Sequence, residues 1–122
     1  MKRLLGSLMF IGILTACSSS ETVTYHKISA EEAKAKMSED VIILDVRTQE
    51  EYAAGHIENA ILIPNESILG EPAELPNKDA VILVYCRSGN RSKQASDKLV
   101  NLGYTQVYDF GGLLDWPYEV VQ

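Results

Sequence analysis

Two short stretches of the chain are apolar at every position. Residues 41–44 read Val-Ile-Ile-Leu, and residues 81–85 read Val-Ile-Leu-Val-Tyr. A strand with one face in water alternates apolar and polar residues, whereas a strand that is apolar throughout is covered on both faces. That burial is typical of a parallel sheet between two layers of helices. The two stretches therefore predict an α/β domain with a mainly parallel sheet.

Helical and strand patterns alternate along the rest of the chain. Ser29 is followed three residues later by Glu32, which predicts a capping box at the start of a helix. Gly55 and Gly103 are expected to end the helices over 48–54 and 92–102. The expected strands are 25–28, 41–44, 60–63, 81–85 and 106–108, and the expected helical segments are 30–37, 48–54, one turn within 67–77, 92–102 and 113–116.

The first residues have the composition of a targeting segment. A short basic start precedes an almost unbroken apolar run over 4–14, which is too short to span a bilayer. The Leu-Thr-Ala-Cys string that ends at Cys17 resembles the bacterial lipobox, in which cleavage before the cysteine accompanies its lipidation. We expect a lipoprotein signal peptide at 1–16, a lipidated Cys17 with a polar tether at 17–24, and a domain at 25–122 held on a membrane of the cell envelope. The alternative is a plain signal peptide that leaves Cys17 a free thiol.

Lipidation of Cys17 would leave Cys86 as the one unpaired thiol of the exported chain. An unpaired thiol is a liability in an oxidising compartment unless it is useful. The alternative is a buried cysteine that packs as a small apolar residue. The sequence around Cys86 decides between the two.

Cys86 directly follows the second apolar stretch and opens the string Cys-Arg-Ser-Gly-Asn-Arg-Ser, which leads into a helix. Ligands of α/β sheets bind at the carboxyl ends of the strands. The N-terminus of the following helix offers free N–H groups and the positive end of the helix dipole, and both stabilise a thiolate. This placement predicts that Cys86 is a nucleophile rather than an inert core residue.

The rest of the string is suited to holding an anion near that thiolate. Arg87 and Arg91 supply positive charge within a chain whose formal net charge is −6. Gly89 permits backbone angles that turn amides inward, and the two serines offer hydroxyl donors to the same pocket. The candidate substrate-binding residues are Arg87, Ser88, Gly89, Asn90, Arg91 and Ser92.

Three strings of this sequence resemble motifs of the rhodanese-like sulfurtransferases, and they occur in the same order as in that family. The 86–92 string closely matches the persulfide-forming loop of that family. The other two are Leu-Asp-Val-Arg at 44–47, continued by Glu-Tyr at 51–52, Gly-His-Ile at 55–57 and Ile-Pro at 63–64, and Gly-Gly at 111–112 followed by Trp116. The resemblance covers most of residues 25–120.

The resemblance implies a five-stranded, mainly parallel sheet flanked by helices on both faces, and a double displacement at Cys86. The thiolate would take a sulfane sulfur from thiosulfate or from a polysulfide or persulfide, and a thiophilic acceptor would remove it from the resulting persulfide. We expect no cofactor and no metal. The expected partners are small sulfur-containing anions, thiol acceptors and the membrane that holds the anchor. The acidic net charge indicates no nucleic-acid partner.

Four other side chains are assigned supporting roles. Asp45 and Arg47 follow a buried strand at the same end of the sheet as Cys86, and the resemblance implies that such residues brace the structure. His56 stands in a Gly-His-Ile string at the entrance to a strand, where a structural hydrogen bond is more typical than general-base catalysis. Trp116 is expected to pack in the core or as a lid.

Two other functions compete with sulfur transfer. Phosphatases and arsenate reductases related to the rhodanese fold also use a thiolate in an amide-lined loop, but they generally have one residue more between the cysteine and the arginine. Four residues separate Cys86 from Arg91, and this shorter loop favours sulfur. A non-catalytic module that senses persulfide or binds a partner is the other alternative, and such a module would typically lack the cysteine.

Overall fold

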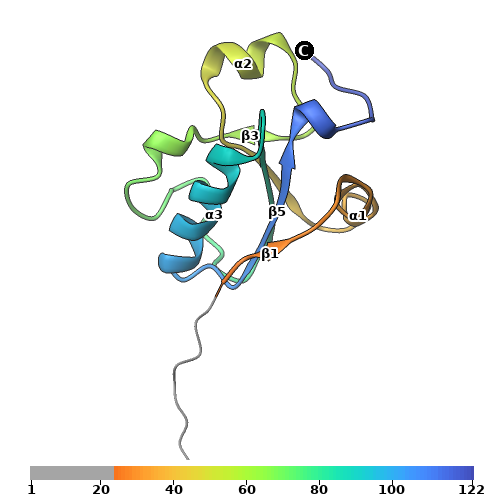
Figure 1. The fold of residues 1–122 in the computed structure, drawn as a ribbon. Helices are drawn as coiled ribbons and strands as arrows, with labels where there is room; N and C mark the ends of the chain where they lie inside the picture. Colours follow the sequence, from red (N-terminus) through yellow and green to blue (C-terminus); the bar gives the residue numbers. More distant parts are fainter. Residues whose placement is uncertain (1–23) are drawn as a thin grey trace, which may run out of the picture.

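The computed structural model describes residues 24–122, which contain five strands that pair in parallel in the order β1-β5-β4-β2-β3 (Figure 1). The strands are β1 (His26–Lys27), β2 (Ile42–Asp45), β3 (Ile61–Leu62), β4 (Val81–Cys86) and β5 (Gln106–Gly112). The helices are α1 (Ala30–Lys36), α2 (Gln49–Ala54) and α3 (Asn90–Asn101), with 3₁₀ turns η1 (Asn65–Ser67) and η2 (Leu113–Asp115). The predicted α/β fold with a five-stranded parallel sheet is confirmed.

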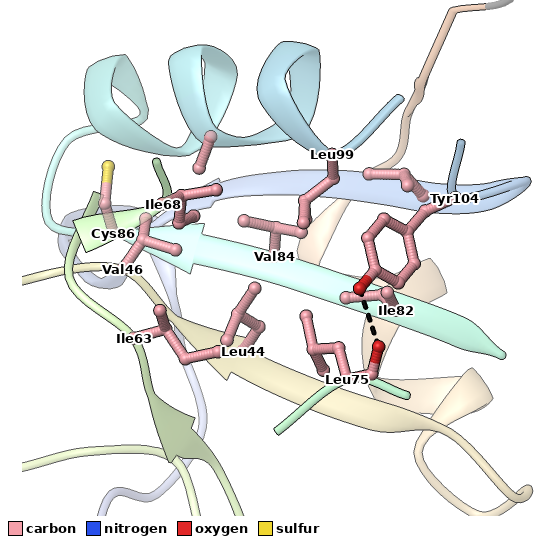
Figure 2. Packing of buried hydrophobic residues seen from close by; sticks show 12 residues of the cluster. Leu44, Val46, Ile63, Ile68, Leu75, Ile82, Val84, Cys86, Leu99 and Tyr104 are labelled. Atoms are coloured by element: carbon pink, nitrogen blue, oxygen red, sulfur yellow. Dashed lines mark hydrogen bonds between the residues drawn. The ribbon is translucent and has the colours of Figure 1, made fainter. Parts of the chain in front are cut away.

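The sheet separates two hydrophobic clusters, which explains why β4 is apolar at every position. Ile82, Val84 and Cys86 belong to the cluster on the α3 side, whereas Leu83 and Tyr85 belong to the cluster on the opposite side. Figure 2 shows the first cluster, in which Cys86 lies at the edge nearest the start of α3. Because α3 covers one face and α1 with η2 covers the other, helical segments flank the sheet on both faces, as expected.

The two short helices before β3 begin with the same reciprocal cap. At α1, Ser29 Oγ accepts a hydrogen bond from the backbone N–H of Glu32, and the Glu32 carboxylate accepts one from Ser29 N–H. Thr48 and Glu51 form the equivalent capping box at α2. Each box satisfies amides that the first helical turn leaves without partners. The capping residues therefore determine where the two helices begin.

Three elements differ from the sequence-based prediction by two residues or more, and the others by one residue at most at either end. α3 begins at Asn90 rather than at residue 92, because Gly89 takes a left-handed conformation with φ of 101° and turns the chain at once. β5 continues to Gly112 rather than ending at 108, since Gly112 pairs with Cys86 beyond a bulge. The helical turn expected within 67–77 occurs earlier, at η1, where it follows β3 directly.

The predicted signal peptide, Cys17 and all of the tether except Thr24 lie outside the described residues. Within residues 24–122, no helix combines the length and the apolar character needed to cross a bilayer.

Candidate functional site

Cys86 ends β4 at the carboxyl edge of the sheet, with no solvent-exposed surface. Its Sγ atom accepts a hydrogen bond from the backbone N–H of Gly89 over 3.0 Å, and Figure 2 shows the sulfur turned toward the start of α3. The predicted position of Cys86 below the N-terminus of a helix is confirmed, and so is the unusual backbone angle of Gly89. An amide in this position stabilises negative charge on the sulfur. Because the sulfur is enclosed, a molecule that reacts with it needs this enclosure to open.

The loop at residues 86–92, called the Cys86 loop below, packs against the backbone of the segment that ends β5. Leu114 N–H donates to the carbonyl oxygen of Arg87 over 3.1 Å. A Cβ atom on Gly112 would overlap with the same carbonyl group, so glycine is required there by the close approach of two backbones. Gly112 therefore lets the loop pack directly against the end of β5.

Arg91 is tied to α2 by a carboxylate. Its Nη1 and Nη2 atoms donate to Oε1 and Oε2 of Glu51 over 2.7 and 3.0 Å. The hydrogen bonds from Arg91 lower the pKa of Glu51 from 4.5 to about 2, and the same contact raises the pKa of Arg91. The positive charge of Arg91 is therefore already neutralised, and an anion that binds Arg91 has to compete with Glu51. In the sequence, Glu51 stands out only as part of the Glu-Tyr string at 51–52.

Arg87 is the loop cation that faces solvent without an ion pair among residues 24–122. It borders an open hollow of about 340 Å³ together with Glu51, Ala54, Leu113 and Val120. The side chains of Ser88 and Asn90 are exposed next to it. Arg87 is thus the residue of the loop best placed to meet an incoming anion.

The hydroxyl of Ser92 is buried and bonded to protein acceptors, whereas the prediction placed it as a donor in the pocket of the loop. Ser92 lies on the buried face of α3, where its Oγ is 2.7 Å from Oδ1 of Asp109 and 3.1 Å from the carbonyl oxygen of Gly89. The helical position of Ser92 decides this direction, because the side chain points toward the sheet. Its partner Asp109 was not predicted. A carboxylate within the otherwise apolar run before Gly111 could have indicated that this side chain is buried with a polar partner.

Asp45 and Arg47 form a buried network with Tyr85 rather than contacts to the sulfur. Arg47 Nη2 donates to Asp45 Oδ2 and to the carbonyl oxygen of Gly55, each over 2.7 Å. Tyr85 Oη donates to Asp45 Oδ2 over 2.6 Å and accepts from Ile57 N–H over 3.1 Å. Burial raises the pKa of Tyr85, and its hydrogen bond to Asp45 adds to the effect. The network joins β2, β4 and the end of α2, which supports the assigned bracing role.

His56 and Trp116 also have structural contacts. His56 Nδ1 lies 2.9 Å from the carbonyl oxygen of Tyr52, and the two rings stack with centroids 3.7 Å apart. The backbone of His56 bridges to Val121. Trp116 is largely buried against Phe110. These contacts support the structural assignments of both residues. No group of three or more metal-ligating side chains occurs in the described part of the chain.

The chain is similar in sequence and in fold to rhodanese-like proteins. The family model of the rhodanese-like domain matches residues 29–118. A protein of Allochromatium vinosum named sulfurtransferase is 41% identical over 80 residues, which cover 65% of this chain and 74% of that protein. Thiosulfate sulfurtransferase PspE of Escherichia coli is 40% identical over 73 residues, covering 59% and 70% of the two chains. The crystal structure of a rhodanese-related protein from Thermoplasma volcanium superposes with a TM-score of 0.70 at 33% identity, covering 80% of this chain and 98% of that one.

Proposed function

The chain belongs to the rhodanese-like domain family, and we propose that it is a sulfurtransferase in which Cys86 carries a sulfane sulfur as a persulfide. The observation that carries the proposal is the enclosed Cys86 sulfur, which accepts a hydrogen bond from Gly89 N–H beside Arg87 and Arg91. The names of the relatives, sulfurtransferase and thiosulfate sulfurtransferase, support the same activity.

In the first half-reaction the Cys86 thiolate attacks the outer sulfur of thiosulfate. A sulfur–sulfur bond forms at Cys86 while the sulfur–sulfur bond of the donor breaks, and the electron pair of that bond leaves with sulfite. Arg87 holds the anionic donor, because it carries no ion pair in the described structure. The Gly89 amide faces the developing charge on sulfur. A polysulfide or an organic persulfide would react in the same way with a different leaving group.

In the second half-reaction a thiophilic acceptor attacks the terminal sulfur of the persulfide. The bond between the two sulfurs breaks, and its electron pair returns to Cys86 as a thiolate. A sulfur whose anion is stabilised by amides leaves readily, so the feature that favours loading also favours release. Cyanide yields thiocyanate in this step, and a cellular thiol yields a persulfide.

The proposal is tested by thiocyanate formation from thiosulfate and cyanide. We expect turnover by the wild-type protein and none by Cys86→Ser. Turnover that survives in Cys86→Ser, or a wild-type protein that forms no thiocyanate, would contradict the assignment. Aryl phosphate hydrolysis that depends on Cys86 would instead favour the phosphatase alternative, and sulfur uptake without release would favour a persulfide-sensing module.

We also propose that the protein is a lipoprotein of the cell envelope, anchored through Cys17. The support is the lipobox-like string that ends at Cys17, which precedes the described residues. Because the strands are parallel, Thr24 enters β1 at the end of the sheet opposite to Cys86, so an anchor there would leave the Cys86 loop open to solutes. Growth with labelled palmitate should label the wild-type protein but not Cys17→Ala, and equal labelling of the two would refute the anchor.

A further inference from the structure

Asp109 is a buried carboxylate that the proposed reaction does not use. It lies on β5 beside Val84, two residues before Cys86 on the neighbouring strand, and it has no solvent-exposed surface. No Lys or Arg of the described residues forms an ion pair with it. Burying a carboxyl group costs free energy unless its hydrogen bonds are satisfied, and packing alone would be met by an apolar residue of similar size. Asp109 therefore calls for an explanation beyond core packing.

The hydrogen bonds of Asp109 join two segments that are distant in the sequence. Its Oδ1 atom accepts from Ser92 Oγ over 2.7 Å and from Gly111 N–H over 2.9 Å. Its Oδ2 atom is buried without a hydrogen-bond partner in the described structure. One carboxylate oxygen thus fastens the first turn of α3 to the end of β5.

Both segments contact Gly89 in the Cys86 loop. Ser92 Oγ also lies 3.1 Å from the carbonyl oxygen of Gly89, the residue whose N–H donates to Cys86 Sγ. A Cβ atom on Gly89 would approach Gly111 Cα to 3.6 Å, so the loop and the end of β5 are in contact. A displacement of either segment would move the Gly89 amide away from the sulfur.

We propose that Asp109 is a positioning residue for sulfur transfer, acting through Ser92 and Gly111 to hold the Gly89 amide against Cys86 Sγ. The inference rests on the proposed function, since it assigns the carboxylate a part in that reaction. Asp109 touches neither donor nor sulfur in this role. What matters is its capacity to accept two hydrogen bonds at one oxygen.

This role predicts different outcomes for two variants of similar size. Asp109→Asn keeps an oxygen that accepts from Ser92 and Gly111, and its NH₂ group takes the place of the unpartnered Oδ2. Asp109→Leu keeps the volume but accepts no hydrogen bond. Asp97→Leu, on the exposed side of α3, is the matched control for loss of a carboxylate.

The experiment measures two rates at Cys86 in the full-length chain. The first is sulfur loading from thiosulfate, expressed per protein molecule that can be loaded. The second is alkylation by iodoacetamide, assigned to Cys86 rather than Cys17 by peptide mass. In Asp109→Leu we expect loading at saturating thiosulfate to slow about tenfold, as the loss of the hydrogen bonds that hold the loop implies. Alkylation should quicken about tenfold, because a displaced loop no longer encloses the sulfur. Asp109→Asn and Asp97→Leu should stay within about threefold of the wild type in both rates.

A purely structural role would lower the melting temperature and the loadable fraction, but not the rate per loadable site. Equal rates for Asp109→Leu and wild type would overturn the inference, as would an Asp109→Asn protein as slow as Asp109→Leu. If Asp109→Leu does not fold, Ser92→Ala provides a second test, because it removes the hydrogen bond from Ser92 to Asp109. It should slow loading and quicken alkylation, and unchanged rates would overturn the inference. Absence of loading in the wild type would refute the proposed function, and the alkylation rates would still report whether Asp109 holds the loop.

Discussion

Replacing Glu51 by Gln separates two contacts made by one side chain. The carboxylate completes the capping box of α2 by accepting from Thr48 N–H, and it also pairs with both terminal nitrogens of Arg91. Gln supports a capping box as well as Glu does, but it lacks the charge that pairs with the guanidinium. Glu51→Gln therefore tests the ion pair between α2 and the Cys86 loop.

The expected loss of stability follows from the geometry and exposure of this pair. Lowering the pKa of Glu51 from 4.5 to about 2 corresponds at face value to roughly 3 kcal/mol, and hydrogen bonds from Thr48 contribute to that shift besides those from Arg91. The side chains of Arg91 and Glu51 are 29% and 26% exposed, however, so water screens their interaction. We expect Glu51→Gln to reduce the free energy of unfolding by about 1–1.5 kcal/mol, above the average of exposed pairs because the contact is bidentate.

Glu32→Gln is the matched control for the helix cap. Glu32 forms the same reciprocal box with Ser29, and it forms no ion pair with Lys or Arg in the described structure. The control variant should change the free energy of unfolding by less than about 0.5 kcal/mol. Urea denaturation of the three proteins at pH 7 measures both differences.

The contribution of Glu51 to the free energy of unfolding depends on pH, and its sign follows from the lowered pKa. A carboxyl group whose pKa is lower in the folded state stabilises the fold above its unfolded pKa, and this contribution is lost as the pH falls through the folded pKa. For Glu51 the window runs from 4.5 down to about 2. The difference between wild type and Glu51→Gln should thus be complete at neutral pH and shrink on acidification within that window.

The same variant should change donor binding. Loss of the carboxylate frees the positive charge of Arg91, so we expect the KM for thiosulfate to fall about two- to fivefold. Equal destabilisation by Glu51→Gln and Glu32→Gln, or a stability difference that grows at low pH, would refute the reasoning about the ion pair. An unchanged KM would show that Arg91 does not meet the donor.

Two further substitutions test the support of the site. Gly112→Ala should lower the free energy of unfolding by about 1–3 kcal/mol and abolish sulfur loading, because its Cβ would overlap with the carbonyl of Arg87, whereas Gly70→Ala, which adds a Cβ in open space, should do neither. Tyr85→Phe should cost about 1–3 kcal/mol in urea denaturation, since it removes a buried donor from Asp45. Because burial raises the pKa of Tyr85, the alkaline absorbance titration of this variant should match that of the wild type until unfolding begins.

The features that the sequence predicted correctly depend on local pattern. Uniformly apolar strands, the Ser29–Glu32 capping box and the position of Cys86 between β4 and α3 each follow from neighbouring residues. The same applies to Gly89, whose left-handed conformation was expected from its place in a tight loop. These local features determine the fold and the position of the candidate nucleophile.

The features that the sequence did not predict are contacts between residues far apart along the chain. Glu51 and Arg91 are separated by 40 positions, and Ser92 and Asp109 by 17. The continuation of β5 to Gly112 was also missed, because two glycines have low strand propensity and only the backbone of the Cys86 loop explains their pairing. Periodicity and spacing do not specify such contacts, since they arise when the strand order brings the loop, α2 and β5 together.

The mass of the intact protein before and after exposure to thiosulfate tests the central claim most directly. We predict that the wild-type protein gains the mass of one sulfur atom, that cyanide removes it, and that Cys86→Ser gains nothing. No gain in the wild type with either thiosulfate or polysulfide, or an equal gain in Cys86→Ser, would contradict a persulfide on Cys86.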